Sequence, residues 1–249
     1  MSLEILYACA CVLFAAIVRG FSGFGFAMLT ITSISVALPP ATVVPAMFLL
    51  EVAAGVHLLP SIWKHVHWRS IGILVSMGIA FTPPGVYLLA NVPADPMKVA
   101  LSVVVFASAA VLLAGVQMKR MPTSMETAAT GAASGLLNGA FGMGGPPIIV
   151  FFLGSSLALE AGRASIIATF LATDLATLPV LFAFGLFTWD SIELAILSLP
   201  MLAAGVFIGS RLVGRVNERL ARKAVLIVLM LLASMIGAQS LLALFAPLQ

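Results

Sequence analysis

One apolar segment of this chain is interrupted by a run of glycines and prolines that breaks any regular helix. The run reads Asn138-Gly139-Ala140-Phe141-Gly142-Met143-Gly144-Gly145-Pro146-Pro147. Glycine admits backbone angles that other residues avoid, and proline has a fixed φ that suits the first turn of a new helix. The sequence therefore predicts one helix that ends inside this run and another that begins near Pro146.

A weaker copy of the same break lies upstream, in the run Arg19-Gly20-Phe21-Ser22-Gly23-Phe24-Gly25-Phe26. A shift of 119 positions aligns three glycines of each run: Gly20 with Gly139, Gly23 with Gly142, and Gly25 with Gly144. The shared pattern is G-x-x-G-x-G, and here the second helix is expected to begin near Phe26. Breaks at matching places in two apolar halves indicate the binding site of a secondary transporter.

The composition places the chain in a membrane. Hydrophobic residues make up 62% of the 249 residues and charged residues only 8%, whereas soluble domains carry roughly 25% charged residues. Apolar stretches recur along the whole length and lack the period-two alternation of barrel strands. The sequence therefore predicts an all-α integral membrane protein in which residues 1–249 form a single transmembrane domain.

Other residues extend the duplication beyond the two breaks. Trp68 matches Trp189 at a shift of 121, and Gly85 matches Gly205 at a shift of 120. A shift this constant predicts two repeats, residues 3–120 and residues 125–245, of about five helical pieces each. Each break is interpreted as the tip of a helical hairpin whose arms, at about 15 residues, are shorter than the roughly 20 that a full span needs.

The distribution of basic residues predicts that the two repeats are inverted. Lysine and arginine gather in segments 64–69, 119–120 and 211–223, which are therefore expected on the cytoplasmic side. The segments that match the first and third of these, 187–190 and 91–96, contain no lysine or arginine. Matching loops with opposite charge character are typical of inverted repeats.

A hairpin tip at membrane depth has to face protein or a water-filled cavity, because lipid cannot satisfy its backbone groups. The helix that leaves each tip presents unpaired N–H groups and the positive end of its dipole, which together favour an anion. We expect the two tips to form one anion-binding cradle near the midplane. The alternative is that the glycines only allow close helix packing, and this is the favoured interpretation of Gly131 and Gly135.

Two polar side chains accompany the tips. Arg19 lies beside the first tip within apolar sequence. Its planar guanidinium group can donate two parallel hydrogen bonds to an oxyanion. The alternative is that its side chain extends to the membrane interface. Asn138 occupies the corresponding place at the second tip, and Ser22 adds a hydroxyl. The candidate substrate-binding residues are Arg19, Gly20, Ser22, Gly23, Gly25, Asn138, Gly139, Gly142, Gly144 and Gly145.

Two carboxylates, Glu51 and Asp174, lie inside predicted spans at matching positions. They are candidates for proton coupling or for a counter-charge to Arg19, and the alternative is an internal ion pair or a hydrogen-bonded carboxylic acid. Cys9 and Cys11 are two residues apart on a helix, so they predict neither a disulfide nor a metal site. The chain lacks HExxH, serine–histidine and CxxC patterns and basic runs interleaved with aromatics, so we expect no enzyme, no cofactor and no nucleic-acid partner.

With its G-x-x-G-x-G tips, the second of which ends in Gly-Gly-Pro-Pro, the chain resembles the sulfite exporter TauE/SafE family, also called toluene-sulfonate uptake permeases. The resemblance extends from about Leu6 to Leu242, and the first tip departs from the second at Phe26 and Ala27. It implies a multi-pass protein of the bacterial cytoplasmic membrane that exports sulfite, sulfoacetate or a similar anion. An anion channel and an oxyanion uptake permease are the alternatives, and a homodimer is left open.

Overall fold

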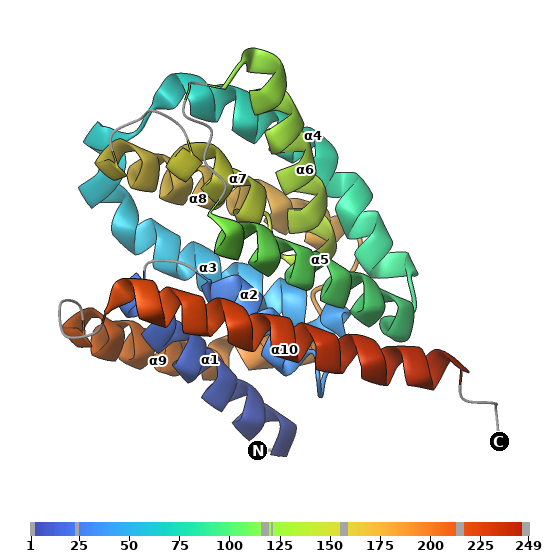
Figure 1. Ribbon diagram of the computed structural model, residues 1–249. Helices are drawn as coiled ribbons and strands as arrows, with labels where there is room; N and C mark the ends of the chain where they lie inside the picture. The colour runs from blue at the N-terminus through green and yellow to red at the C-terminus, as the bar shows by residue number, and fades with distance from the viewer. Residues whose placement is uncertain are drawn as a thin grey trace. The chain divides into compact units, whose positions relative to one another are not determined.

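The computed structural model describes residues 3–22, 25–115, 120, 122–154, 159–212 and 217–245. These residues form ten α-helices and one short 3₁₀ helix, and they contain no strand (Figure 1). In chain order the elements are α1 (Leu3–Ser22), α2 (Phe26–Ile34), α3 (Pro40–Ile62), η1 (Trp63–His65), α4 (Trp68–Asn91), α5 (Ala94–Ala114), α6 (Ser124–Phe141), α7 (Gly145–Gly154), α8 (Leu159–Ala183), α9 (Trp189–Leu212) and α10 (Glu218–Phe245).

The all-α membrane prediction is confirmed. Within the described residues, six helices are long and apolar enough to cross a membrane: α1, α4, α5, α8, α9 and α10. The helices that follow the two breaks begin at Phe26 and at Gly145, where the sequence predicts them. The expected arm length is wrong for α1, which continues through Gly20 to a length of 20 residues. By contrast, α2 and α7 have only 9 and 10 residues, too few for a full span.

The chain divides into two compact units that do not coincide with the predicted repeats. Residues 1–47, 92–114 and 187–249 form the first unit, and residues 48–91 and 115–186 form the second. In the first unit α1 packs along α9 and α5 packs along α10, and in the second unit α4 packs along α6. The first helix of each predicted repeat thus packs on the fourth helix of the other. This reciprocal pairing agrees with a duplicated chain, and the inverted orientation of the halves stays a prediction.

Glycines let α1 and α9 approach backbone to backbone in the first unit. A Cβ atom on Gly20 would lie 2.6 Å from the carbonyl oxygen of Val206, and one on Gly205 would lie 2.5 Å from the Cβ of Ala16. Both distances are too short for any side chain to fit without moving a helix. In a bilayer, where lipid is as apolar as leucine, such close contact supplies much of the attraction between helices.

The pair α4 and α6 in the second unit is built in the same way. A Cβ atom on Gly135 would collide with the backbone of Gly78, and one on Gly139 would collide with the carbonyl oxygen of Thr82. A Cβ atom on Gly131 would also meet the α4 backbone. The interpretation of Gly131 and Gly135 as packing glycines is therefore confirmed, and Gly20 and Gly139 share this role.

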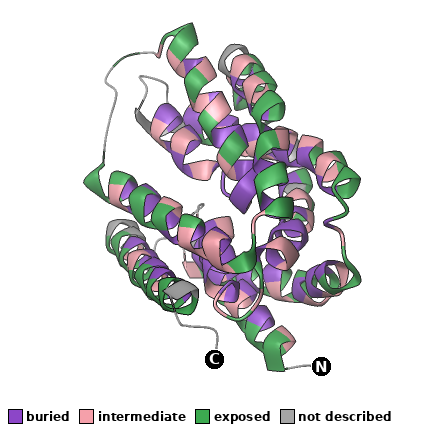
Figure 2. Cartoon of the chain, turned by 90° about the vertical axis from the view of Figure 1, so that its right-hand side faces the viewer, coloured by how far each residue is buried: buried purple, intermediate pink, exposed green. Residues whose placement is uncertain are grey.

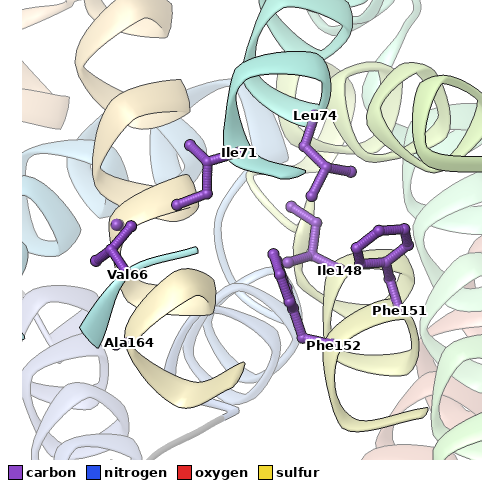
Figure 3. Packing of buried hydrophobic residues seen from close by; sticks show 8 residues of the cluster. Val66, Ile71, Leu74, Ile148, Phe151, Phe152 and Ala164 are labelled. Atoms are coloured by element: carbon purple, nitrogen blue, oxygen red, sulfur yellow. The ribbon is translucent and has the colours of Figure 1, made fainter. Parts of the chain in front are cut away.

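An apolar cluster holds α7 against α4 and α8 in the second unit (Figure 3). Its buried members are Val66, Ile71, Leu74, Ile148, Phe151, Phe152, Ala164 and Ala168. The rings of Phe151 and Phe152 meet edge to face, with centroids 5.0 Å apart. Because the surrounding lipid is also apolar, this cluster stabilises the unit mainly through close packing.

Individual helices carry buried residues on one side and exposed residues on the other (Figure 2). The exposed side is strongly apolar, as Phe182 and Trp189 show with exposed fractions of 76% and 75%. Exposed side chains of this size would be a liability in water and are suited to contact with lipid.

Candidate anion-binding site

The second break is a left-handed turn followed immediately by a new helix. Gly142 ends α6 with φ 63° and ψ 22°, a conformation that strains residues with a side chain. Its N–H donates to the carbonyl oxygen of Asn138 at 2.7 Å, and the N–H of Met143 donates to that of Leu137 at 3.4 Å. Both amides are therefore used to close the end of α6.

Asn138 fixes the shape of this turn from inside α6. Its Oδ1 accepts a hydrogen bond from the N–H of Gly144 at 3.2 Å, and its Nδ2 donates to Oδ1 of Asp174 in α8 at 3.1 Å. The hydroxyl of Ser134, one turn earlier, donates to the carbonyl oxygen of Gly144 at 2.7 Å. Gly144 is thus held through both its N–H and its carbonyl group, and the Asn138 side chain connects the turn to α8 by two hydrogen bonds.

Two glycines of this tip lie against other side chains. A Cβ atom on Gly144 would lie 2.7 Å from the hydroxyl of Ser134 and 3.1 Å from the Cβ of Asn138. A Cβ atom on Gly145 would meet the ring of Phe170 at 3.4 Å. The need for glycine at position 144 therefore follows from the contact with α6.

The second tip has few amide groups left to offer an anion. The first three residues of α7 are Gly145, Pro146 and Pro147, and proline has no N–H. An ordinary helix N-terminus has unpaired donors at these positions, so here only Gly145 retains one. The prolines that define the break in the sequence also weaken it as an anion site.

The first tip keeps the donors that the second has lost. α2 begins after Gly25, which has φ 85° and ψ 0° and whose carbonyl oxygen accepts from the N–H of Leu29 at 2.9 Å. The three residues in between, Phe26, Ala27 and Met28, each carry an N–H, and no side chain caps this helix in the described part of the chain. Phe26 and Met28 are only 2% and 4% exposed. Buried amides at a helix start require an acceptor.

A guanidinium group lies over the ring of Phe26, the first residue of α2. Arg19 is in the last turn of α1, and its Cζ atom lies 5.4 Å from the centroid of the Phe26 ring, within the range of a cation–π contact. The contact places a fixed positive charge beside the positive end of the α2 dipole. Two positive features this close in a low-dielectric region favour a negatively charged ligand.

The other candidate residues are placed as follows. Gly20 and Gly139 lie in the contacts of α1 with α9 and of α6 with α4. Gly23 and the side chain of Ser22 lie outside the described residues. Glu51 is partly buried in α3. Their roles toward a substrate stay predictions.

Asp174 is buried in α8, where its carboxylate accepts the hydrogen bond from Asn138. This bond favours the structural alternative for Asp174, a hydrogen-bonded carboxyl group. Two residues of the site were not predicted from the sequence, Ser134 and Phe170. Ser134 precedes Asn138 by four residues, so both fall on one face of a helix, and that spacing could have indicated it.

Comparison with known proteins gives one family model and one similar protein. The family model described as "Sulfite exporter TauE/SafE" matches residues 8–236. The chain is also 27% identical over 211 residues to a protein of Cupriavidus necator named "Probable sulfite/organosulfonate exporter TauE", a match that covers 80% of this chain and 77% of that one. No solved structure matches the chain.

Proposed function

Because the chain belongs to the TauE/SafE family of sulfite exporters, we propose that it exports sulfite or a small organosulfonate across the bacterial cytoplasmic membrane. Family membership and the six apolar helices make it a multi-pass membrane transporter. The observation that carries the choice of substrate is the α2 N-terminus, whose three consecutive amides have no side-chain cap among the described residues and whose first side chain, Phe26, contacts Arg19. The similar protein of C. necator is named for the same kind of substrate.

Sulfite and sulfonates present several oxygens that carry negative charge on one tetrahedral or pyramidal group. The amides of Phe26, Ala27 and Met28 would accept one face of such a group, as helix N-termini do with phosphate and sulfate. The Arg19 guanidinium would bind a second edge through two parallel hydrogen bonds. The ligand would thereby supply an acceptor for donors that no side chain caps in the described part of the chain.

The second tip would contribute mainly a rigid shape. Asn138 and Ser134 hold Gly144, and Gly145 offers one N–H. We infer that the positive charge for the substrate comes mainly from the first tip. Alternating access would follow if one group of helices rocks against the other around this site.

Export of an anion has a driving force without ATP. With a negative cytoplasm, each outward-moving negative charge gains about 2.3 kcal/mol per 100 mV. The sequence contains no P-loop pattern, in line with a uniporter or a proton-linked carrier. Glu51 is a candidate for proton coupling because it is a partly buried carboxylate within α3.

Replacing Arg19 tests this proposal. Purified Arg19→Gln, reconstituted in liposomes, should lose transport of sulfite and isethionate while its thermal unfolding temperature without ligand stays near that of the parent. Arg163→Gln is the matched control, because Arg163 is an exposed arginine at the start of α8, and it should transport normally. Normal transport by Arg19→Gln would remove Arg19 from the site.

An anion channel with the same binding groups is the rival, and the kinetics separate the two. A carrier saturates at low turnover and shows counterflow of labelled substrate against unlabelled substrate. A flux that rises linearly with concentration, without counterflow, would support a channel.

A further inference from the structure

A polar pocket lies in the first compact unit at the C-terminal end of α2, where α5 begins beside α10. Its volume is about 190 Å³, and its polar lining consists of Ser35, Asp95, Lys98, Gln239 and Ser240. It is separate from the α2 N-terminus, because α2 is a nine-residue helix of about 13 Å and the pocket is at its other end. Typical drug-sized sites are larger, so the pocket suits a small molecule.

The pocket contains one charge of each sign. Asp95 and Lys98 are three residues apart near the start of α5, so they lie on one face of that helix. Both are partly buried, and the described residues give neither of them an ion-pair partner within 4.0 Å. A simple anion would be attracted by Lys98 and repelled by Asp95, and a simple cation would meet the reverse.

A buried hydroxyl without a partner lines the same pocket. Ser35 is 0% exposed, and its Oγ atom makes no hydrogen bond within the described part of the chain. Ser240 is 4% exposed and lines the pocket from α10. Because no part of Ser35 is exposed, its hydroxyl lies behind the pocket surface, and the groups that a ligand can reach are those of Asp95, Lys98 and Gln239.

The wall that carries these groups is closely packed. A Cβ atom on Gly237 would lie 2.6 Å from Oγ of Ser102, which brings α10 directly against α5. The backbones of α5 and α10, which carry most of the polar lining, are therefore held at a fixed distance.

We propose that this pocket is a second binding site, selective for a small zwitterion with a sulfonate and an ammonium group. Lys98 binds the sulfonate oxygens, and the Asp95 carboxylate binds the ammonium group. An aminosulfonate satisfies both charges, whereas a hydroxysulfonate of equal size leaves Asp95 without a partner. The choice of sulfonate as the anionic group rests on the proposed function, and the requirement for an ammonium group rests on the pocket alone.

The test compares two probes of nearly equal shape, 2-aminoethanesulfonate and 2-hydroxyethanesulfonate, by calorimetric titration of the full chain in lipid nanodiscs. Asp95→Asn should weaken binding of the aminosulfonate about tenfold, the effect of losing one charge-assisted hydrogen bond, and should leave the hydroxysulfonate within twofold. Lys98→Gln should weaken both. Asp190→Asn is the matched control, because Asp190 is the second residue of α9 just as Asp95 is the second residue of α5.

One further variant separates this site from the one at the α2 N-terminus. Ala27→Pro, which removes an amide at the α2 start, should leave unchanged the part of aminosulfonate binding that Asp95→Asn removes. Both proposals stand if Ala27→Pro abolishes transport of the hydroxysulfonate and Asp95→Asn weakens the binding of the aminosulfonate alone. If Asp95→Asn weakens both probes equally, or weakens neither, the zwitterion site is overturned whatever happens to transport.

Discussion

The substitution Ala27→Pro would remove one amide donor from the start of α2 and leave the helix in place. Proline is tolerated in the first turn of a helix because the N–H at that position has no partner within the helix. The second tip supplies the precedent, since Pro146 and Pro147 occupy the second and third positions of α7. Ala27 is the second residue of α2, so the variant gives the first tip one of the features that weaken the second.

The size of the effect follows from the number of donors. The α2 N-terminus offers three amides, those of Phe26, Ala27 and Met28, and the variant leaves two of them and Arg19. A hydrogen bond to a charged group contributes about 1.5–3 kcal/mol. Losing one should therefore weaken the binding of sulfite by about 10- to 150-fold.

Binding of sulfite to Ala27→Pro is measured by calorimetric titration in nanodiscs, with initial uptake rates in liposomes as the functional readout. Ala41→Pro is the control, because Ala41 is the second residue of α3, after Pro40. It should bind and transport sulfite as the parent does. Unchanged affinity in Ala27→Pro, with the helix content preserved by circular dichroism, would refute the assignment of the α2 amides to the anion.

Three further variants test other parts of the account. Glu51→Gln should flatten the pH dependence of transport in liposomes, and an unchanged profile would leave Glu51 with a structural role. Gly135→Ala, whose Cβ would collide with the α4 backbone, should destabilise the fold by about 1–3 kcal/mol and lower the unfolding temperature, whereas Gly72→Ala, at a position with open space around it, should not. At the start of α6, Arg120 and the Thr123 backbone lower the pKa of Glu126 to about 2 from 4.5. Because the pKa is lower in the folded state, the ionised Glu126 carboxylate stabilises the start of α6 above about pH 4.5. This stabilisation is lost as the pH falls toward about 2. Glu126→Gln should therefore unfold at a lower temperature than the parent at neutral pH, and a difference that persists unchanged near pH 2 would contradict the assignment.

Local sequence predicted the helices well because the signals that end and start a helix are local. The starts of α2 and α7 follow directly from the glycine and proline runs, and the apolar stretches give the spans. The length of α1 differs from the prediction, because the glycine pattern places Gly20 inside the break. In the structure its lack of a side chain serves the contact with α9, and the helix continues.

The site was harder to predict because it depends on which backbone groups remain unpaired. Asn138 was expected to donate to a substrate, yet both ends of its side chain are engaged, one by Gly144 and the other by Asp174. The absence of amides on Pro146 and Pro147 can be read from the sequence, whereas the pairing of Gly144 cannot. The contact of Arg19 with Phe26 agrees with the expectation that this arginine lies beside the first tip.

The most direct test of the central claim is to locate the anion itself. Selenite has the shape and charge of sulfite, and selenium scatters X-rays anomalously, so one crystal of the protein grown with selenite would show its position. The account predicts an anomalous peak for selenium at the α2 N-terminus. The oxygens of that selenite should lie within about 2.7–3.2 Å of the amide nitrogens of Phe26, Ala27 or Met28, with the Arg19 guanidinium in contact. A well-occupied peak elsewhere, with these amides bonded to protein atoms instead, would contradict it.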